Sequence, residues 1–165
     1  MTFTRRALLQ SSAIAATAAA AGYSFLKPDA HAAATFEVTR SDAEWKKQLT
    51  PAQYDVLRRE GTERPFTSKL LDEKRAGTFA CAGCEQDLFS SRTKYDSKTG
   101  WPSFWEPLEK ATGTEKNSTF GITRTSVHCS RCGGHLGHVF NDGPKPTGLR
   151  YCMNGVAMTF KPAAA

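Results

Sequence analysis

The five cysteines of this chain divide into two pairs and one single residue. Cys81 and Cys84 form one C-x-x-C pair, and Cys129 and Cys132 form the other. Two such pairs are typical of a site in which four thiolates bind one tetrahedral zinc ion. Because 44 residues separate the pairs, we expect the metal to hold two separate hairpins together. Four cysteine ligands leave no open coordination position, so the spacing favours a structural metal over a catalytic one.

Cys152 lies apart from these pairs, within the run Arg150-Tyr151-Cys152-Met153-Asn154. If this run is a strand, Arg150, Cys152 and Asn154 lie on one face, since side chains alternate along a strand. The charge of Arg150 would then favour the thiolate form of Cys152, and Asn154 could donate a hydrogen bond nearby. Cys152 is therefore a candidate nucleophile. The alternative is a buried core cysteine, which is the commonest state of a free thiol.

Two histidines precede Cys152 closely. His135 and His138 lie 17 and 14 residues before it, and the turn residues 141–144 can bring the chain back alongside them. An imidazole next to a thiolate can protonate the group that leaves when the thiolate attacks. We expect His128, His135 and His138 not to be ligands of the metal.

Aromatic residues cluster in the run 100–105, Gly-Trp-Pro-Ser-Phe-Trp. The Trp101 indole and its neighbours can form the wall of a small pocket for a methyl or thioether group. The alternative is that these rings belong to the core of a β domain.

The first 32 residues have the pattern of a twin-arginine signal peptide. Arg5 and Arg6 precede a mildly apolar run at 13–25, and Ala30-His31-Ala32 is a candidate cleavage site. The run contains too much Ala, Ser and Thr to favour a stable membrane span, although an uncleaved anchor is the alternative. We therefore expect a periplasmic or exported protein, with a mature domain over residues 33–165.

Export bears on the state of the cysteines, because exported compartments are oxidising. The twin-arginine route carries proteins that are already folded, so zinc can be bound before the thiols meet an oxidant. This favours a metal site, while two disulfides plus one odd thiol is the alternative, and it predicts no bound metal. Residues 1–32 hold three of the 22 basic and one of the 16 acidic residues, which leaves 19 and 15 and a net charge of +4. Without a long run of like charges, this balance does not indicate nucleic-acid binding.

The mature chain is expected to be mainly antiparallel β, with a short helical arm over residues 36–66 and a β core over 77–161. Ser41 and Thr50 begin two helices with capping boxes, and the second is expected to end near Glu60 with Gly61 as a left-handed residue. Its narrow apolar stripe indicates a helix that braces a sheet. Short apolar stretches separated by turn residues indicate strands at 78–80, 120–123, 127–129, 138–140, 151–153 and 156–160.

Taken together, the motifs resemble those of the B-type peptide methionine-R-sulfoxide reductases. The resemblance spans about residues 36–161 and also includes the arm. It is carried by Gly100-Trp101-Pro102-Ser103-Phe104, His128-Cys129-x-x-Cys132-Gly133-Gly134-His135-Leu136-Gly137-His138-Val139-Phe140, Asp142-Gly143-Pro144, Pro146-Thr147-Gly148-Leu149-Arg150-Tyr151-Cys152 and Asn154. It implies a fold of two antiparallel sheets with zinc at one end.

The resemblance also implies roles for the candidate residues. Cys152 would attack the R epimer of methionine sulfoxide, release methionine and become a sulfenic acid, while Cys81, Cys84, Cys129 and Cys132 would bind a structural Zn²⁺. His135, His138 and Asn154 would surround the sulfoxide oxygen, and Trp101 would receive the substrate methyl group. Arg150 is assigned to the substrate-binding residues beside Trp101.

One position departs from many relatives, which carry a second, resolving cysteine two residues before the tryptophan. Thr99 occupies that position here. We therefore expect an external thiol, from a thioredoxin-like protein or a small molecule, to reduce the sulfenic acid. The expected substrate is an oxidised exported protein or peptide, and the expected state is a monomer without a membrane span after processing. The alternative function is a non-catalytic zinc-clamped β module that binds a ligand or partner.

Overall fold

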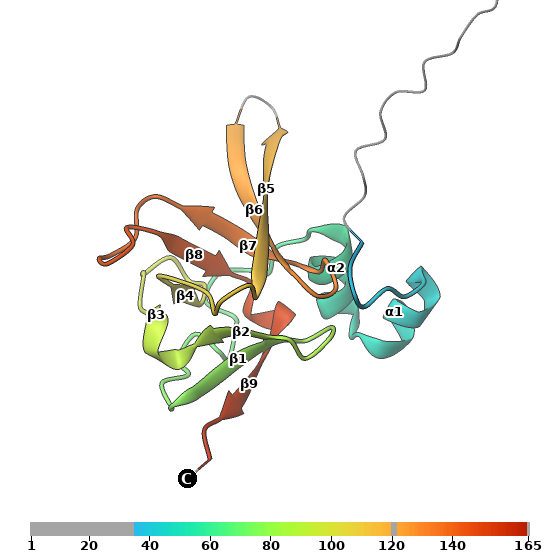
Figure 1. Cartoon of the computed structure of the whole chain (residues 1–165), viewed down its shortest axis with the longest axis horizontal. Helices are drawn as coiled ribbons and strands as arrows, with labels where there is room; N and C mark the ends of the chain where they lie inside the picture. The colour runs from blue at the N-terminus through green and yellow to red at the C-terminus, as the bar shows by residue number, and fades with distance from the viewer. Residues whose placement is uncertain (1–34, 120–121, 165) are drawn as a thin grey trace, which may run out of the picture. The chain divides into compact units, whose positions relative to one another are not determined.

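Two antiparallel sheets and two short helices make up the described part of the chain (Figure 1). The computed structural model describes residues 35–119 and 122–164, so the predicted signal peptide lies outside it. One sheet has three strands and the other has six, which confirms the expected mainly β fold with two antiparallel sheets. Among the described residues, no helix is long and apolar enough to cross a bilayer.

Strand order shows how the chain builds the two sheets. The smaller sheet places β2 (Asp87–Ser90) beside β1 (Gly77–Cys81) and β1 beside β9 (Met158–Pro162). The larger sheet has the order β3 (Lys94–Tyr95), β4 (Ser103–Phe104), β8 (Arg150–Met153), β7 (His135–Phe140), β6 (Ile122–Cys129) and β5 (Thr112–Thr119). The last strand therefore returns to pair with the first.

Three phenylalanines join the two sheets in the core. Phe79 of β1 and Phe89 of β2 both contact Phe104 of β4, with ring centroids 5.0 and 4.3 Å apart. All three side chains are fully buried. Such ring pairs contribute about 0.5–1.5 kcal/mol each beyond the burial of their area. The aromatic core thus holds the smaller sheet against the strand that neighbours β8.

The helical arm begins as expected. Helix α1 (Asp42–Gln48) and helix α2 (Pro51–Arg59) both have complete capping boxes, at Ser41 and Thr50. The residue in the left-handed conformation is Glu60 (φ 57°), so the expectation for Gly61 was wrong. A Cβ at position 61 would lie 2.2 Å from the Asp55 carboxylate, so glycine provides room there.

The arm contributes more to the core than its narrow stripe indicated. Trp45 of α1 and Leu49 after it are buried, as are Val56 and Leu57 of α2. These four side chains belong to the same core cluster as the sheet residues. The arm is therefore part of the hydrophobic core as well as a brace for the larger sheet.

Four of the six predicted stretches lie within strands, whereas four other strands were not predicted. The predicted strands at 78–80, 127–129, 138–140 and 151–153 lie within β1, β6, β7 and β8. The stretch 156–160 divides between the 3₁₀ turn η2 (Gly155–Ala157) and β9, while 120–121 of the stretch 120–123 lie outside the described residues. Strands β2, β3, β4 and β5 were not predicted. The β5 sequence, TGTEKNST, is polar and is held by pairing with β6 along its whole length.

Candidate active site and metal centre

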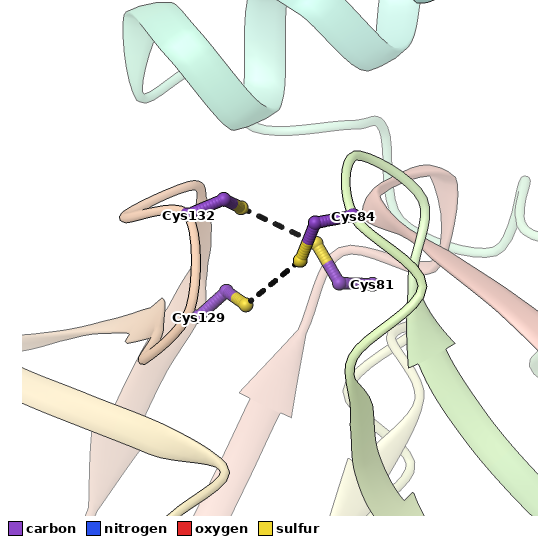
Figure 2. Close-up of side chains that lie close together, drawn as sticks. All are labelled: Cys81, Cys84, Cys129 and Cys132. Atoms are coloured by element: carbon purple, nitrogen blue, oxygen red, sulfur yellow. Dashed lines mark hydrogen bonds between the residues drawn. The ribbon is translucent and has the colours of Figure 1, made fainter. Parts of the chain in front are cut away.

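Four cysteine side chains converge between the two sheets (Figure 2). Cys81 ends β1 and Cys84 lies in the turn after it, while Cys129 ends β6 and Cys132 lies in the turn after that strand. All four Sγ atoms lie within 4.8 Å of one another. Among the described residues, no other group of three or more His, Cys, Asp or Glu side chains is close enough together to hold a metal ion.

The sulfur positions fit a tetrahedral metal ion. The Sγ atoms of Cys81 and Cys132 are 3.8 Å apart, and those of Cys84 and Cys129 are 3.5 Å apart. Four sulfurs about 2.3 Å from a central zinc would be separated by about 3.8 Å, so the observed cluster needs little adjustment to hold one. The Gly83 N–H lies 3.4 Å from the Cys81 Sγ, where it can donate a hydrogen bond to a thiolate.

Close packing also shifts the pKa values of these thiols in opposite directions. Hydrogen bonding with Cys129 raises the pKa of Cys81 and lowers the pKa of Cys84. Several thiolates this close together repel one another unless a cation lies between them. The donor set and its spacing therefore suit a metal ion that takes all four sulfurs as thiolates.

A second cluster of functional side chains surrounds a cavity of about 200 Å³. Strand pairing assembles it: Cys152 of β8 lies opposite His138 of β7 on one side and Ser103 of β4 on the other. The expected return of the chain alongside the histidines is thus confirmed. The cavity is lined by Thr62, Trp101, Arg124, Gly137, His138, Phe140, Cys152 and Asn154.

Cys152 is the partly exposed cysteine of this cavity. Its sulfur lies 3.7 Å from the Thr99 hydroxyl, which in turn lies 2.8 Å from the Ser97 hydroxyl. A Cβ at Gly137 would lie 2.2 Å from the Cys152 carbonyl oxygen, so glycine lets β7 approach β8 at this point. Cys152 is therefore accessible, and the backbone beside it is tightly held.

The two histidines lie in different environments. His138 lines the cavity and is half-buried; burial, and next the positive charge of Arg124, lower its pKa. His135 is 4% exposed, does not line the cavity, and has its Nδ1 2.9 Å from the Ser126 hydroxyl. Burial lowers the pKa of His135 to about 4. The pairing of β7 with β6 is irregular here, since His128 lies opposite His135 and Val127 opposite Gly137, which leaves Leu136 as an extra residue. The two imidazoles therefore lie close together, with ring centroids 5.3 Å apart.

Trp101 and Asn154 line the cavity and are both tied to Glu63. The Trp101 indole Nε1–H donates to the Glu63 carbonyl oxygen at 3.1 Å, and the Glu63 N–H donates to the Asn154 Oδ1 at 3.0 Å. The Asn154 Nδ2 donates to the Leu136 carbonyl oxygen at 3.1 Å. The two predicted residues are therefore brought together by a residue of the arm.

Arg150 lies next to the cavity and does not line it. Its guanidinium makes two 2.8 Å hydrogen bonds to the Asp142 carboxylate and lies 4.3 Å from the Phe140 ring centre. The Asp142 hydrogen bonds are the main cause that raises the pKa of Arg150, with a smaller contribution from Cys152. The hydrogen bonds of Arg150 therefore go to Asp142 instead of the cavity.

Several residues of the site were not predicted from the sequence. Thr62 and Arg124 line the cavity, and Glu63 binds two of its residues. Phe140 and Gly137 belong to the histidine-bearing run, so their closeness in sequence to His138 could have indicated that they line the site. Thr62 and Glu63 are distant in sequence from the cysteines and histidines, so no spacing indicated them.

Comparison with known proteins agrees with this geometry. A family model described as the SelR domain matches residues 49–162. A peptide methionine sulfoxide reductase MsrB of Agrobacterium fabrum is 54% identical over 127 residues, which cover 76% of this chain and 94% of the relative. The proteins of the same name from Leptospira interrogans and Methanosarcina barkeri are 54% and 53% identical, over 76% and 75% of this chain and 97% and 88% of their own lengths. The chain therefore belongs to the SelR family, that of the MsrB peptide-methionine (R)-S-oxide reductases, and is an oxidoreductase.

Proposed function

We propose that this protein reduces the R epimer of methionine sulfoxide in proteins or peptides to methionine, with Cys152 as the nucleophile. The observation that carries the proposal is one cavity of about 200 Å³ that holds the accessible Cys152 sulfur together with Trp101, His138 and Asn154. The names of the relatives are those of peptide methionine sulfoxide reductases. A non-catalytic binding module has no need of a free thiol in such a cavity.

The reaction transfers one oxygen atom and two electrons. The Cys152 thiolate attacks the sulfur of the sulfoxide while the sulfoxide oxygen takes up a proton. The bond between the two sulfurs and the sulfur–oxygen bond of the substrate then break, the hydroxyl passes to the Cys152 sulfur to give a sulfenic acid, and the thioether is released. Methionine sulfoxide is thereby reduced by two electrons and Cys152 is oxidised by two.

His138 is the better candidate for the proton donor of the two histidines. It lines the cavity and is paired with Cys152 across the sheet. His135 is buried behind it, with ring centroids 5.3 Å apart, and its low pKa keeps it neutral near pH 7. We propose that His138 faces the sulfoxide oxygen together with Asn154, and that His135 acts through the position of His138. Trp101 then forms the wall for the substrate methyl group.

An external thiol completes the cycle. The Thr99 hydroxyl occupies the place beside the Cys152 sulfur where a resolving cysteine would otherwise lie. The other four cysteines of the chain lie in the metal cluster. Two external thiols would therefore reduce the sulfenic acid to a thiol, with release of water and formation of a disulfide between them.

The metal is proposed to be zinc, in a structural role. Four thiolates in a tetrahedral set suit Zn²⁺ and leave no position for substrate or water. The ion would hold the ends of β1 and β6 together, and its chemistry would contribute to folding only. We further propose that residues 1–32 direct export by the twin-arginine route, that the enzyme acts as a monomer, and that it repairs oxidised exported proteins.

Replacing the nucleophile should abolish the first turnover. In Cys152→Ser, single-turnover reduction of a peptide R sulfoxide should fall at least ~1000-fold, since a serine hydroxyl is far less nucleophilic than a thiolate. The measurement is chromatography of the peptide product, with the S epimer and wild-type protein as controls. Full reduction of the R epimer by this variant, with its metal content unchanged, would show that another group attacks the substrate.

A cysteine at position 99 should let the chain resolve its own sulfenic acid by forming an internal disulfide. Because the Thr99 hydroxyl is 3.7 Å from the Cys152 sulfur, Thr99→Cys should form a disulfide with Cys152 after one turnover. The wild-type protein should instead yield a sulfenic acid at Cys152 that a dimedone-type reagent traps. Peptide mass spectrometry distinguishes these products. The model of external reduction is wrong if the wild-type protein forms an internal disulfide with loss of metal.

The histidines should titrate differently from free imidazole. Burial lowers the folded-state pKa of His135 from 6.5 to about 4, so its ring should remain neutral at pH 5 in NMR titrations. The unfolded chain binds a proton there from about pH 6.5 downward, so stability should fall by up to about 3 kcal/mol as the pH drops from 6.5 towards 4. Chemical denaturation should show this loss in the wild-type protein relative to His135→Asn. Protonation of the metal-binding thiolates affects both proteins, so the difference isolates His135; titration of the ring near pH 6.5 would contradict its burial as the cause.

A further inference from the structure

The segment around Glu63 joins the arm to both walls of the candidate active site. The backbone carbonyl of Glu63 accepts from the Trp101 indole, and its backbone N–H donates to Asn154. The preceding residue, Thr62, lines the cavity itself. One residue of the arm therefore contacts the proposed methyl-binding wall and one member of the proposed oxygen-binding cluster.

The Glu63 carboxylate holds this arrangement against the loop that follows Asn154. Its two oxygens accept hydrogen bonds from the N–H groups of Gly155 and Val156, the latter at 3.0 Å. A Cβ at Gly155 would lie 1.8 Å from the Ser68 hydroxyl, so this part of the chain is packed closely against the segment that follows the arm. Among the described residues Glu63 has no ion-pair partner, so these backbone donors are the partners of its charge.

These contacts also determine which way the Asn154 amide points. Its Oδ1 accepts from the Glu63 N–H, and its Nδ2 donates to the Leu136 carbonyl. In a flipped amide, the Asn154 NH₂ would face the Glu63 N–H, which is also a donor, and the Asn154 Oδ1 would face the Leu136 carbonyl, which is also an acceptor. The Oδ1 is thus occupied by the Glu63 N–H, and the amide can offer its second N–H to the cavity that Asn154 lines.

We propose that Glu63 is a positioning residue, whose carboxylate anchors the arm to the loop 154–156 and thereby orients the Trp101 indole and the Asn154 amide for the substrate. The inference rests on the proposed function of the cavity. Glu63 itself acts through these two residues and does not line the cavity. It lines instead a second cavity, of about 560 Å³.

The test is Glu63→Gln, which keeps the shape of the side chain. The glutamine NH₂ cannot accept a hydrogen bond, so one of the two loop N–H groups loses its partner. We expect kcat/KM for a peptide R sulfoxide to fall at least tenfold. We also expect the Trp101 indole N–H resonance, assigned with Trp101→Phe, to shift in the NMR spectrum. Glu115→Gln, which removes an exposed carboxylate on β5, should change neither quantity.

Either of two results for Glu63→Gln would overturn the proposal. One is an unchanged kcat/KM, and the other is a lower kcat/KM with an unchanged Trp101 resonance. If Glu63→Gln does not fold, Glu63→Asp withdraws the charge by one methylene and should produce the same shift and loss of activity. Retention of the wild-type resonance and kcat/KM in Glu63→Asp would again overturn the proposal. Absence of activity in the wild-type protein would contradict the proposed function, while the resonance would still report on the Glu63 contacts.

Discussion

The four-sulfur cluster between the sheets is the constraint on which the rest of the structure depends. It joins the end of β1 in the smaller sheet to the end of β6 in the larger sheet. Since β6 pairs with β7, and β7 pairs with β8, a fixed β6 places His138 opposite Cys152. A metal ion held there would organise the active strands from a distance and would also keep four thiols away from oxidants.

The same arrangement separates the four thiols that can bind a metal from the one thiol that can react with a substrate. Four cysteines are drawn together among packed side chains, with three of them buried, while the fifth is partly exposed beside a cavity. Polar groups and the Trp101 indole line the same cavity as that fifth sulfur. Two of these groups, Trp101 and Asn154, are held by hydrogen bonds to the backbone of Glu63 in the arm. The arm therefore supports the site as well as the core.

Parts of this organisation were predictable from the sequence because they depend on local spacing. The two C-x-x-C pairs indicated the metal cluster, and the short interval between His138 and Cys152 indicated adjacent strands. The burial of His135 was not predicted, because it depends on an irregularity in the pairing of β6 with β7 between Val127 and His128. Glu63 was missed for a different reason: it acts through its backbone and through loop amides, which leave no pattern of residue types. The polar strand β5 likewise has no hydrophobic period that would reveal it.

Selective alkylation near neutral pH, with metal content measured on the same sample, tests the central claim most directly. We expect a thiol reagent to modify Cys152 alone within the first minutes, while one metal ion per chain is retained. Peptide mass spectrometry would identify the modified residue. An unreactive Cys152, or rapid modification of the four clustered cysteines in a protein without metal, would contradict the account.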